Sequence, residues 1–158
     1  MCTVKSNIIF LDIDGVLNTW RFQDYQVKHH ECDDWDAQFN FDPICMKNLK
    51  ELVEKTNSKI VVSSSWKKSD NGMKDIELNL RLYGLAKVLL GHTIRHPKDL
   101  RCFEISEWWY RNKDKYNQFI ILDDEKHMRC LSGRLIVCDE NNGFTKETLS
   151  EALNKLGV

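Results

Sequence analysis

Two aspartates, Asp12 and Asp14, directly follow the apolar run at residues 8–11 (IIFL) and precede Gly15. Such a run is typical of a buried parallel strand, and open α/β sheets place their ligands at the carboxyl ends of strands. In extended backbone, side chains two residues apart lie on the same side, so these carboxylates would repel each other. The spacing therefore indicates a divalent cation or a shared proton at the pair, with a plain acidic turn as the alternative.

Hydroxyl, basic and acidic side chains lie after or near the other apolar runs. The hydroxyls are Ser63, Ser64 and Ser65, the bases are Lys98 and Arg101, and the acids are Asp123 and Asp124. A metal-held phosphate needs this set of groups: oxygen ligands for a hard cation, a hydroxyl donor, and a positive charge for the remaining phosphate oxygens. Each group alone is an ordinary turn or surface feature, so the interpretation depends on their meeting at one edge of a sheet.

The elements that would position these residues alternate along the chain. Apolar runs predict strands at residues 8–11, 60–62, 119–122 and 135–137, with a further short strand at 87–90. Apolar spacing and end signals predict helices over 43–56, 75–83 and 98–111 and from Thr145 to about residue 156. This alternation predicts one α/β domain over residues 1–158, with a mainly parallel sheet flanked by helices.

Residues 19–40 break this alternation. The segment is rich in aromatic and charged side chains and has no clean period. Long connections in compact domains are more often functional than accidental. We therefore expect a long loop, acting as a flap near the site.

The composition of the chain narrows its class. With 158 residues, 42% of them hydrophobic and 30% charged, it has the size and balance of one globular domain. The formal net charge of −1 gives no global field for nucleic acid, which leaves room only for a local basic patch. No apolar run approaches the ~18 residues that span a bilayer. The N-terminal residues do not resemble a signal peptide, and the six cysteines form no C-x-x-C pair. We expect a cytoplasmic protein with reduced cysteines and no membrane partner.

The ordered motifs resemble the haloacid-dehalogenase (HAD) superfamily. They are LDIDGVLN at 11–18, VVSSSW at 61–66, Arg101 within RCFEI, and ILDDE at 121–125. More narrowly, the chain is similar to the small HAD domains of "Swiss Army Knife" RNA-repair proteins, whose late G-[LF]-T pattern is matched by residues 143–145. The resemblance implies a Rossmann-like domain with a minimal or absent cap.

The resemblance also implies a Mg²⁺-dependent phosphohydrolase. Asp12 would be the nucleophile that forms an aspartyl-phosphate, and Asp14 would protonate the leaving oxygen and later deprotonate the attacking water. Mg²⁺ would be held by the Asp12 carboxylate, the Asp14 backbone carbonyl and the acids Asp123 and Asp124. Which of the last two contacts the metal directly is left open.

Residues that would contact the substrate follow from the same resemblance. Ser63 would hydrogen-bond the phosphoryl group and Arg101 would neutralise its charge, with Lys98 as the alternative base. Ser64 and Lys67 are further candidates for substrate binding, although Lys67 is equally well explained as a surface lysine at a helix start. A site with a minimal cap is open to bulky substrates, so the expected partner is a phosphorylated small molecule such as a nucleotide, or a polynucleotide 3′ or 5′ end.

Other classes of protein remain as alternatives. A dehalogenase is disfavoured by Asp14, because an ester oxygen needs a proton on leaving and a halide does not. A phosphoaspartate receiver is disfavoured because residues 60–62 are followed by serines rather than by an aspartate. The main alternative is a catalytically silent HAD-like module that binds or regulates another molecule. The sequence identifies no protein partner.

Overall fold

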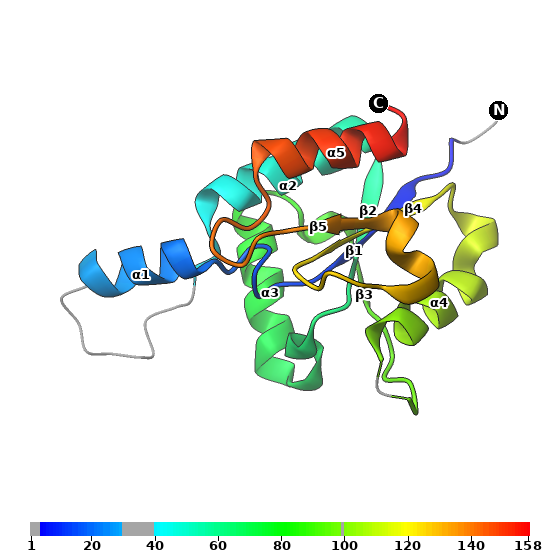
Figure 1. The fold of residues 1–158 in the computed structure, drawn as a ribbon, viewed down its shortest axis with the longest axis horizontal. Helices are drawn as coiled ribbons and strands as arrows, with labels where there is room; N and C mark the ends of the chain where they lie inside the picture. Colours follow the sequence, from blue (N-terminus) through cyan, green and yellow to red (C-terminus); the bar gives the residue numbers. More distant parts are fainter. Residues whose placement is uncertain (1–3, 30–39, 99) are drawn as a thin grey trace.

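The computed structural model describes residues 4–29, 40–98 and 100–158, and the statements below concern these residues. Five strands and five α-helices follow one another along the chain (Figure 1). They are β1 (Asn7–Leu11), α1 (Trp20–His29), α2 (Pro43–Thr56), β2 (Ser58–Val62), α3 (Asp70–Leu82), β3 (Leu89–His92), α4 (Arg101–Asn112), β4 (Phe119–Asp123), β5 (Leu135–Val137) and α5 (Lys146–Leu156). Four short 3₁₀ helices join them: η1 (Ser65–Lys68), η2 (Ala86–Val88), η3 (Lys113–Lys115) and η4 (Arg129–Arg134).

All five strands form one parallel sheet in the order β3-β2-β1-β4-β5. β1 lies at its centre, where Ile9 pairs with Ile60 of β2 and with Ile120 of β4. The four strands predicted from apolar runs are confirmed, and the short strand predicted at 87–90 begins slightly later, at Leu89. The predicted α/β class and parallel sheet are therefore confirmed.

Alternate residues of each strand pack against helices on opposite faces of the sheet. Ile9 and Leu11 belong to a hydrophobic cluster that includes residues of α2, α3 and α5, while Ile8 and Phe10 belong to a second cluster with α4. Figure 1 shows α2 and α5 together on one side of the sheet and α4 on the other. Both faces are covered, so the only solvent-facing parts of the central strands are their ends.

The predicted helices exist, with some shifted starts. α2 begins at Pro43 as predicted, because the Asp42 side chain caps it through the Ile44 N–H. α3 begins at Asp70 rather than near 75, since Ser69 supplies an N-cap that bonds the Gly72 N–H. α4 begins at Arg101 rather than 98. Among the described residues, no helix is long and apolar enough to cross a membrane.

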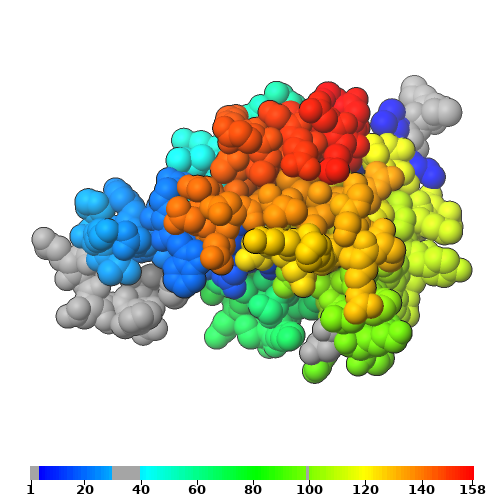
Figure 2. Space-filling model, in the orientation of Figure 1, coloured from blue at the N-terminus to red at the C-terminus, as the bar shows by residue number. Residues whose placement is uncertain are grey.

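The loop predicted over residues 19–40 is helical in its first half, where α1 spans Trp20–His29. Residues 30–39 lie outside the described part of the chain. No described residue of α1 is buried, so there was no apolar period by which the sequence could reveal the helix. Thr19 accepts a hydrogen bond from the Phe22 N–H at the helix start, and Arg21 pairs with the buried Asp42. Figure 2 shows α1, in lighter blue, projecting from the body of the molecule.

Candidate active site

The sheet carries its hydrogen-bond ladder past the strand ends. The Asp12 N–H donates to the Leu122 carbonyl at 3.0 Å, and the Ser63 N–H donates to the Leu11 carbonyl at 2.8 Å. The Thr93 N–H likewise donates to the carbonyl of Val62 at 2.9 Å. The first residue after each of β1, β2 and β3 is thereby fixed at the same edge of the sheet.

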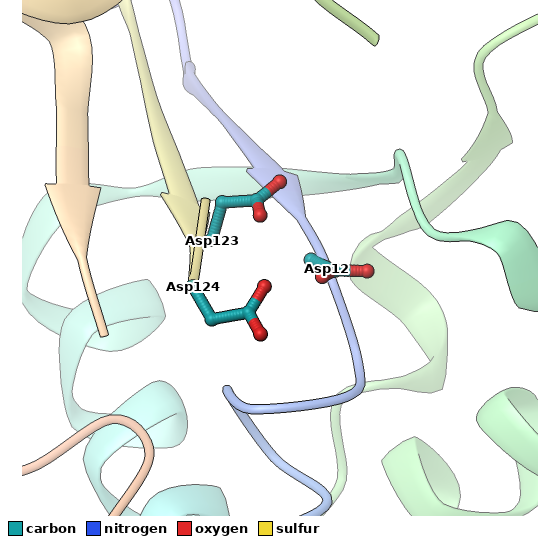
Figure 3. Close-up of side chains that lie close together, drawn as sticks. All are labelled: Asp12, Asp123 and Asp124. Atoms are coloured by element: carbon teal, nitrogen blue, oxygen red, sulfur yellow. The ribbon is translucent and has the colours of Figure 1, made fainter. Parts of the chain in front are cut away.

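Three carboxylates converge at this edge. Asp12 follows β1, Asp123 ends β4, and Asp124 follows it; one carboxylate oxygen of each lies within 4.8 Å of the others. Figure 3 shows the side chains of Asp123 and Asp124 extending from β4 toward Asp12. Asp12 is 4% exposed and Asp123 is fully buried. The structure thus brings together three of the predicted metal-ligating residues.

This acidic cluster is short of positive charge. Arg101 at the start of α4 places its Nη1 atom 3.1 Å from Asp12 Oδ2 and 2.5 Å from Asp123 Oδ2. Burial raises the pKa of Asp12, and the charge of Asp123 raises it further, although Arg101 lowers it. Burial also raises the pKa values of Asp123 and Asp124. One guanidinium faces three carboxylates, and a divalent cation would supply the missing charge.

The donor set fits a hard divalent cation, because all three ligands are carboxylate oxygens. Gly15 makes room for one of them: its φ is +74°, and a Cβ at this position would lie 2.6 Å from Asp124 Oδ2. Only glycine combines this backbone conformation with the absence of a side chain. The turn after β1 therefore admits the Asp124 carboxylate to the cluster.

Asp14 lies apart from the three-acid cluster and is exposed. Its Oδ1 accepts a hydrogen bond from Asn18 Nδ2 at 2.8 Å, and its Oδ2 accepts one from Trp66 Nε1 at 2.9 Å. Asn18 is in turn held by Gln23 of α1, at 2.8 Å. The prediction that repulsion from Asp14 acts on Asp12 is therefore wrong. The charge that raises the pKa of Asp12 comes from Asp123 instead. A metal contact through the Asp14 carbonyl stays a prediction.

The serines at the end of β2 differ in their surroundings. Ser63 Oγ is buried and has no hydrogen-bond partner among the described residues. It lines a pocket of about 470 Å³ together with Arg101 and Asp124. A buried hydroxyl left without a partner costs about 1–3 kcal/mol, and an anion in this pocket would supply one. Ser64, by contrast, accepts from the Trp66 N–H and hydrogen-bonds Asp12, which lowers the pKa of Asp12.

The two candidate lysines lie in different environments. Lys67 is buried, paired with Glu104 of α4, and donates to Thr93 Oγ1 at 2.9 Å, so the surface-lysine interpretation is wrong. Lys98 lies 4.7 Å from the centre of the Phe103 ring, outside the acidic cluster that Arg101 contacts. Roles for Ser64, Lys67 and Lys98 in substrate binding stay predictions.

Several residues at this edge of the sheet were not predicted from the sequence as part of the site. Glu104 and Thr93 complete the environment of Lys67, and Asn18 and Trp66 hold Asp14. The available signals were their positions within or next to the motifs: Asn18 ends LDIDGVLN, Trp66 ends VVSSSW, and Glu104 lies in RCFEI.

Replacing Lys67 with Met should destabilise the protein by about 3–5 kcal/mol, because it leaves the Glu104 carboxylate buried without its partner. The measurement is urea unfolding followed by circular dichroism. The double variant Lys67→Met/Glu104→Leu should recover most of this loss, since apolar pairs replace buried ion pairs at little cost. Equal destabilisation of the single and double variants would contradict the assignment of the loss to an unpaired charge.

The parallel sheet thus brings three acids, a guanidinium and a buried hydroxyl without a described partner to the carboxyl ends of its strands. The family model described as "HAD domain in Swiss Army Knife RNA repair proteins" matches residues 8–149, which is nearly the whole chain. The chain belongs to this family. No curated protein gives a significant match.

Proposed function

We propose that this protein is a Mg²⁺-dependent phosphohydrolase that cleaves phosphate monoesters through an aspartyl-phosphate. The observation that carries the proposal is the convergence of Asp12, Asp123 and Asp124 beside a pocket that holds the unpartnered Ser63 hydroxyl. Membership of a HAD family supports the same class of reaction.

Asp12 is suited to attack phosphorus, because its backbone is fixed at the strand end and its carboxylate faces the pocket-lining Arg101. An Asp12 oxygen forms a bond to phosphorus while the bond to the ester oxygen breaks. That leaving oxygen takes a proton from Asp14. Water then gives a proton to Asp14 and attacks the same phosphorus, which releases inorganic phosphate and restores the Asp12 carboxylate.

The other residues bind and orient the phosphoryl group. Ser63 Oγ donates a hydrogen bond to one of its oxygens, and Arg101 neutralises its charge. Mg²⁺, held by Asp12, Asp123 and Asp124 with the Asp14 carbonyl, would reduce the repulsion between an anionic nucleophile and an anionic phosphate. Lys98 is the alternative base if Arg101 proves dispensable for phosphate affinity.

For the substrate, we propose a phosphorylated polynucleotide end or a nucleotide. The family's description as a domain of RNA repair proteins supports a polynucleotide. Between β1 and α2, α1 is the one helix among the described residues, and it contributes none of the described residues that line the pocket. An open pocket of this kind admits the end of a long substrate.

We also place the protein in a reducing compartment such as the cytoplasm. Four cysteines lie in the described part of the chain, and all four are free thiols. Burial raises the pKa of Cys45 to about 12, so this thiol stays protonated and unreactive. Cys130 is exposed, and an exposed free thiol persists where disulfides are not formed.

The direct test is hydrolysis of p-nitrophenyl phosphate by the purified protein with Mg²⁺ and with EDTA. We expect turnover with Mg²⁺ and its loss in EDTA, restored by excess Mg²⁺. Absence of turnover on this ester and on phosphorylated oligonucleotides and nucleotides would favour the catalytically silent binding module instead.

Mg²⁺ should also stabilise the fold in a pH-dependent way. The pKa values of the three acids are raised in the metal-free fold, so their contribution to stability is present below their unfolded pKa values and is lost as the pH rises through the folded values. Mg²⁺ needs the charged forms and relieves their repulsion. At about 100 times its dissociation constant it should raise Tm by roughly 5–10 °C at pH 8, and the gain should shrink as the pH falls.

Differential scanning fluorimetry at pH 8 and at pH 5 measures this effect. The Asp123→Asn variant should lose most of the Mg²⁺ response. The matched control Asp114→Asn, at an exposed position in η3, should keep it. An equal Tm gain at both pH values would contradict the model of charged carboxylate ligands.

A further inference from the structure

Phe103 of α4 is surrounded by three basic side chains. The His96 ring stacks on it with a centroid distance of 5.2 Å and an interplanar angle of 26°. Lys98 Nζ lies 4.7 Å from the ring centroid, and Arg129 Cζ lies 5.7 Å from it. We name these four residues, His96, Lys98, Phe103 and Arg129, the Phe103 cluster.

The two cations of this cluster have no acidic partner within the part of the chain that the structure describes. Neither Lys98 nor Arg129 forms an ion pair with any described residue, and both are exposed. Elsewhere on the surface, cations commonly pair with an acid one helical turn away, as Arg81 does with Glu77 and Arg111 with Glu107. Two like charges beside one ring repel each other, and an anionic partner would lower that cost.

The backbone supports this placement of Arg129. Its φ is +51°, and among the described residues only one other non-glycine residue, Asn57, has a positive φ. Asn57 ends α2 in the left-handed conformation, which is a common role for asparagine. Arginine has no such preference, so Arg129 adopts a backbone conformation that is costly for its residue type while its guanidinium lies over Phe103.

The cluster is built from the same two chain segments that line the phosphate pocket. Leu100 and Arg101 line the pocket, and Lys98 and Phe103 lie two residues before and after this pair. On the other segment, Asp124 and Glu125 line the pocket, and Arg129 follows four residues later. Figure 2 shows these segments meeting on one face, the first in green and the second in yellow to orange. The two segments that line the pocket are therefore also the two that carry the cations of the cluster.

We propose that the Phe103 cluster binds the sugar–phosphate backbone of a single-stranded polynucleotide whose terminal phosphate occupies the pocket. This inference rests on the proposed function. The Phe103 ring is already covered by His96, Lys98 and Arg129, so the cluster presents positive charge to phosphates rather than an open ring to a base. Because the chain has a net charge of −1 and the pocket contains Asp124 and Glu125, a local basic surface is what a polyanion needs to approach it. Contacts of this kind are independent of base sequence and weaken with salt.

The test measures binding of a fluorescent RNA oligonucleotide with a terminal phosphate by anisotropy, in EDTA so that turnover does not interfere. The double variant Lys98→Gln/Arg129→Gln should bind at least about tenfold more weakly at moderate salt. Its slope of log K against log salt should fall in magnitude by about 1.4, from two phosphate contacts at about 0.7 each. The control Lys113→Gln/Arg134→Gln, which removes cations that lie over Tyr110 and Phe119, should bind like the wild type.

A second variant guards against misfolding. Arg129→Gly removes the cation and suits the positive φ, so it should raise Tm by about 2 °C while weakening binding of the oligonucleotide. Unchanged binding in both variants, or equal loss in the control pair, would overturn the proposal. So would a phosphopeptide of equal charge that binds as tightly and depends equally on the cluster. Hydrolysis of p-nitrophenyl phosphate by the wild type is scored separately, so loss of the proposed function and loss of the binding surface are distinguished.

Discussion

Asp12→Asn is expected to reduce phosphate-ester hydrolysis by at least about 10⁴-fold, because the amide cannot form the bond to phosphorus on which both chemical steps depend. The substitution removes one charge from an acidic cluster that is otherwise repulsive, since the charge of Asp123 raises the pKa of Asp12. The folded protein should therefore be no less stable. Loss of activity together with an unchanged or raised Tm separates a chemical role from a structural one.

The same position allows the intermediate to be observed directly. Rapid quenching of the wild type with substrate, followed by borohydride reduction, should convert an acyl phosphate at residue 12 into homoserine, which peptide mass spectrometry locates. Asp114→Asn is the matched control and should retain both full activity and the labelled peptide. Reduction at another aspartate, or full activity in Asp12→Asn, would contradict the assigned nucleophile.

Asp14→Asn should lower kcat by about 10²–10⁴-fold, as is usual for the loss of a general acid and base. Phosphate binding should be spared, because the Asp14 carboxylate lies apart from the three-acid cluster and the Arg101 contact. The loss should be smaller for a substrate with a good leaving group such as p-nitrophenolate, which needs less protonation. Measuring kcat for aryl and alkyl phosphates in parallel checks this difference.

Trp66→Phe is the companion variant. It removes the N–H that holds Asp14 Oδ2 but keeps an aromatic ring against Phe41. One hydrogen bond to a carboxylate is worth about 1.5–3 kcal/mol, so a loss of about tenfold in kcat is expected, again larger for alkyl than for aryl phosphates. Equal effects on both ester types would indicate a general disturbance of the site rather than mispositioning of Asp14.

Much of this arrangement was predictable because parallel strands end at one edge. The apolar runs before Asp12 and Asp123 identify β1 and β4, and in a parallel pair their carboxyl ends lie side by side. The convergence of these carboxylates therefore follows from pattern alone. The helix α1 did not follow from pattern, because burial produces apolar periodicity and α1 buries none of its described residues.

Contacts between residues that are far apart along the chain could also not be predicted from the sequence. Lys67 and Glu104 are 37 residues apart, and nothing in either motif indicates that they form a buried pair. Arg101 and Lys98 are three residues apart and chemically similar. Which of them contacts the acids therefore depends on where α4 begins. Since the helix begins at Arg101, Lys98 lies before it and is directed to Phe103 instead of the acids.

The continuation of the sheet ladder beyond the strand ends has a consequence for how the site moves. The amide of Asp12 is hydrogen-bonded to Leu122 and that of Ser63 to Leu11, on the three innermost strands. Amides that are hydrogen-bonded on central strands are expected to be among the slowest in a protein to exchange with deuterium. The backbones of the nucleophile and of the hydroxyl donor are thus expected to be among the most firmly held parts of the fold. Local loosening of the backbone is therefore a costly way to relieve the crowding of the acids, whereas a bound cation would relieve it without moving the chain.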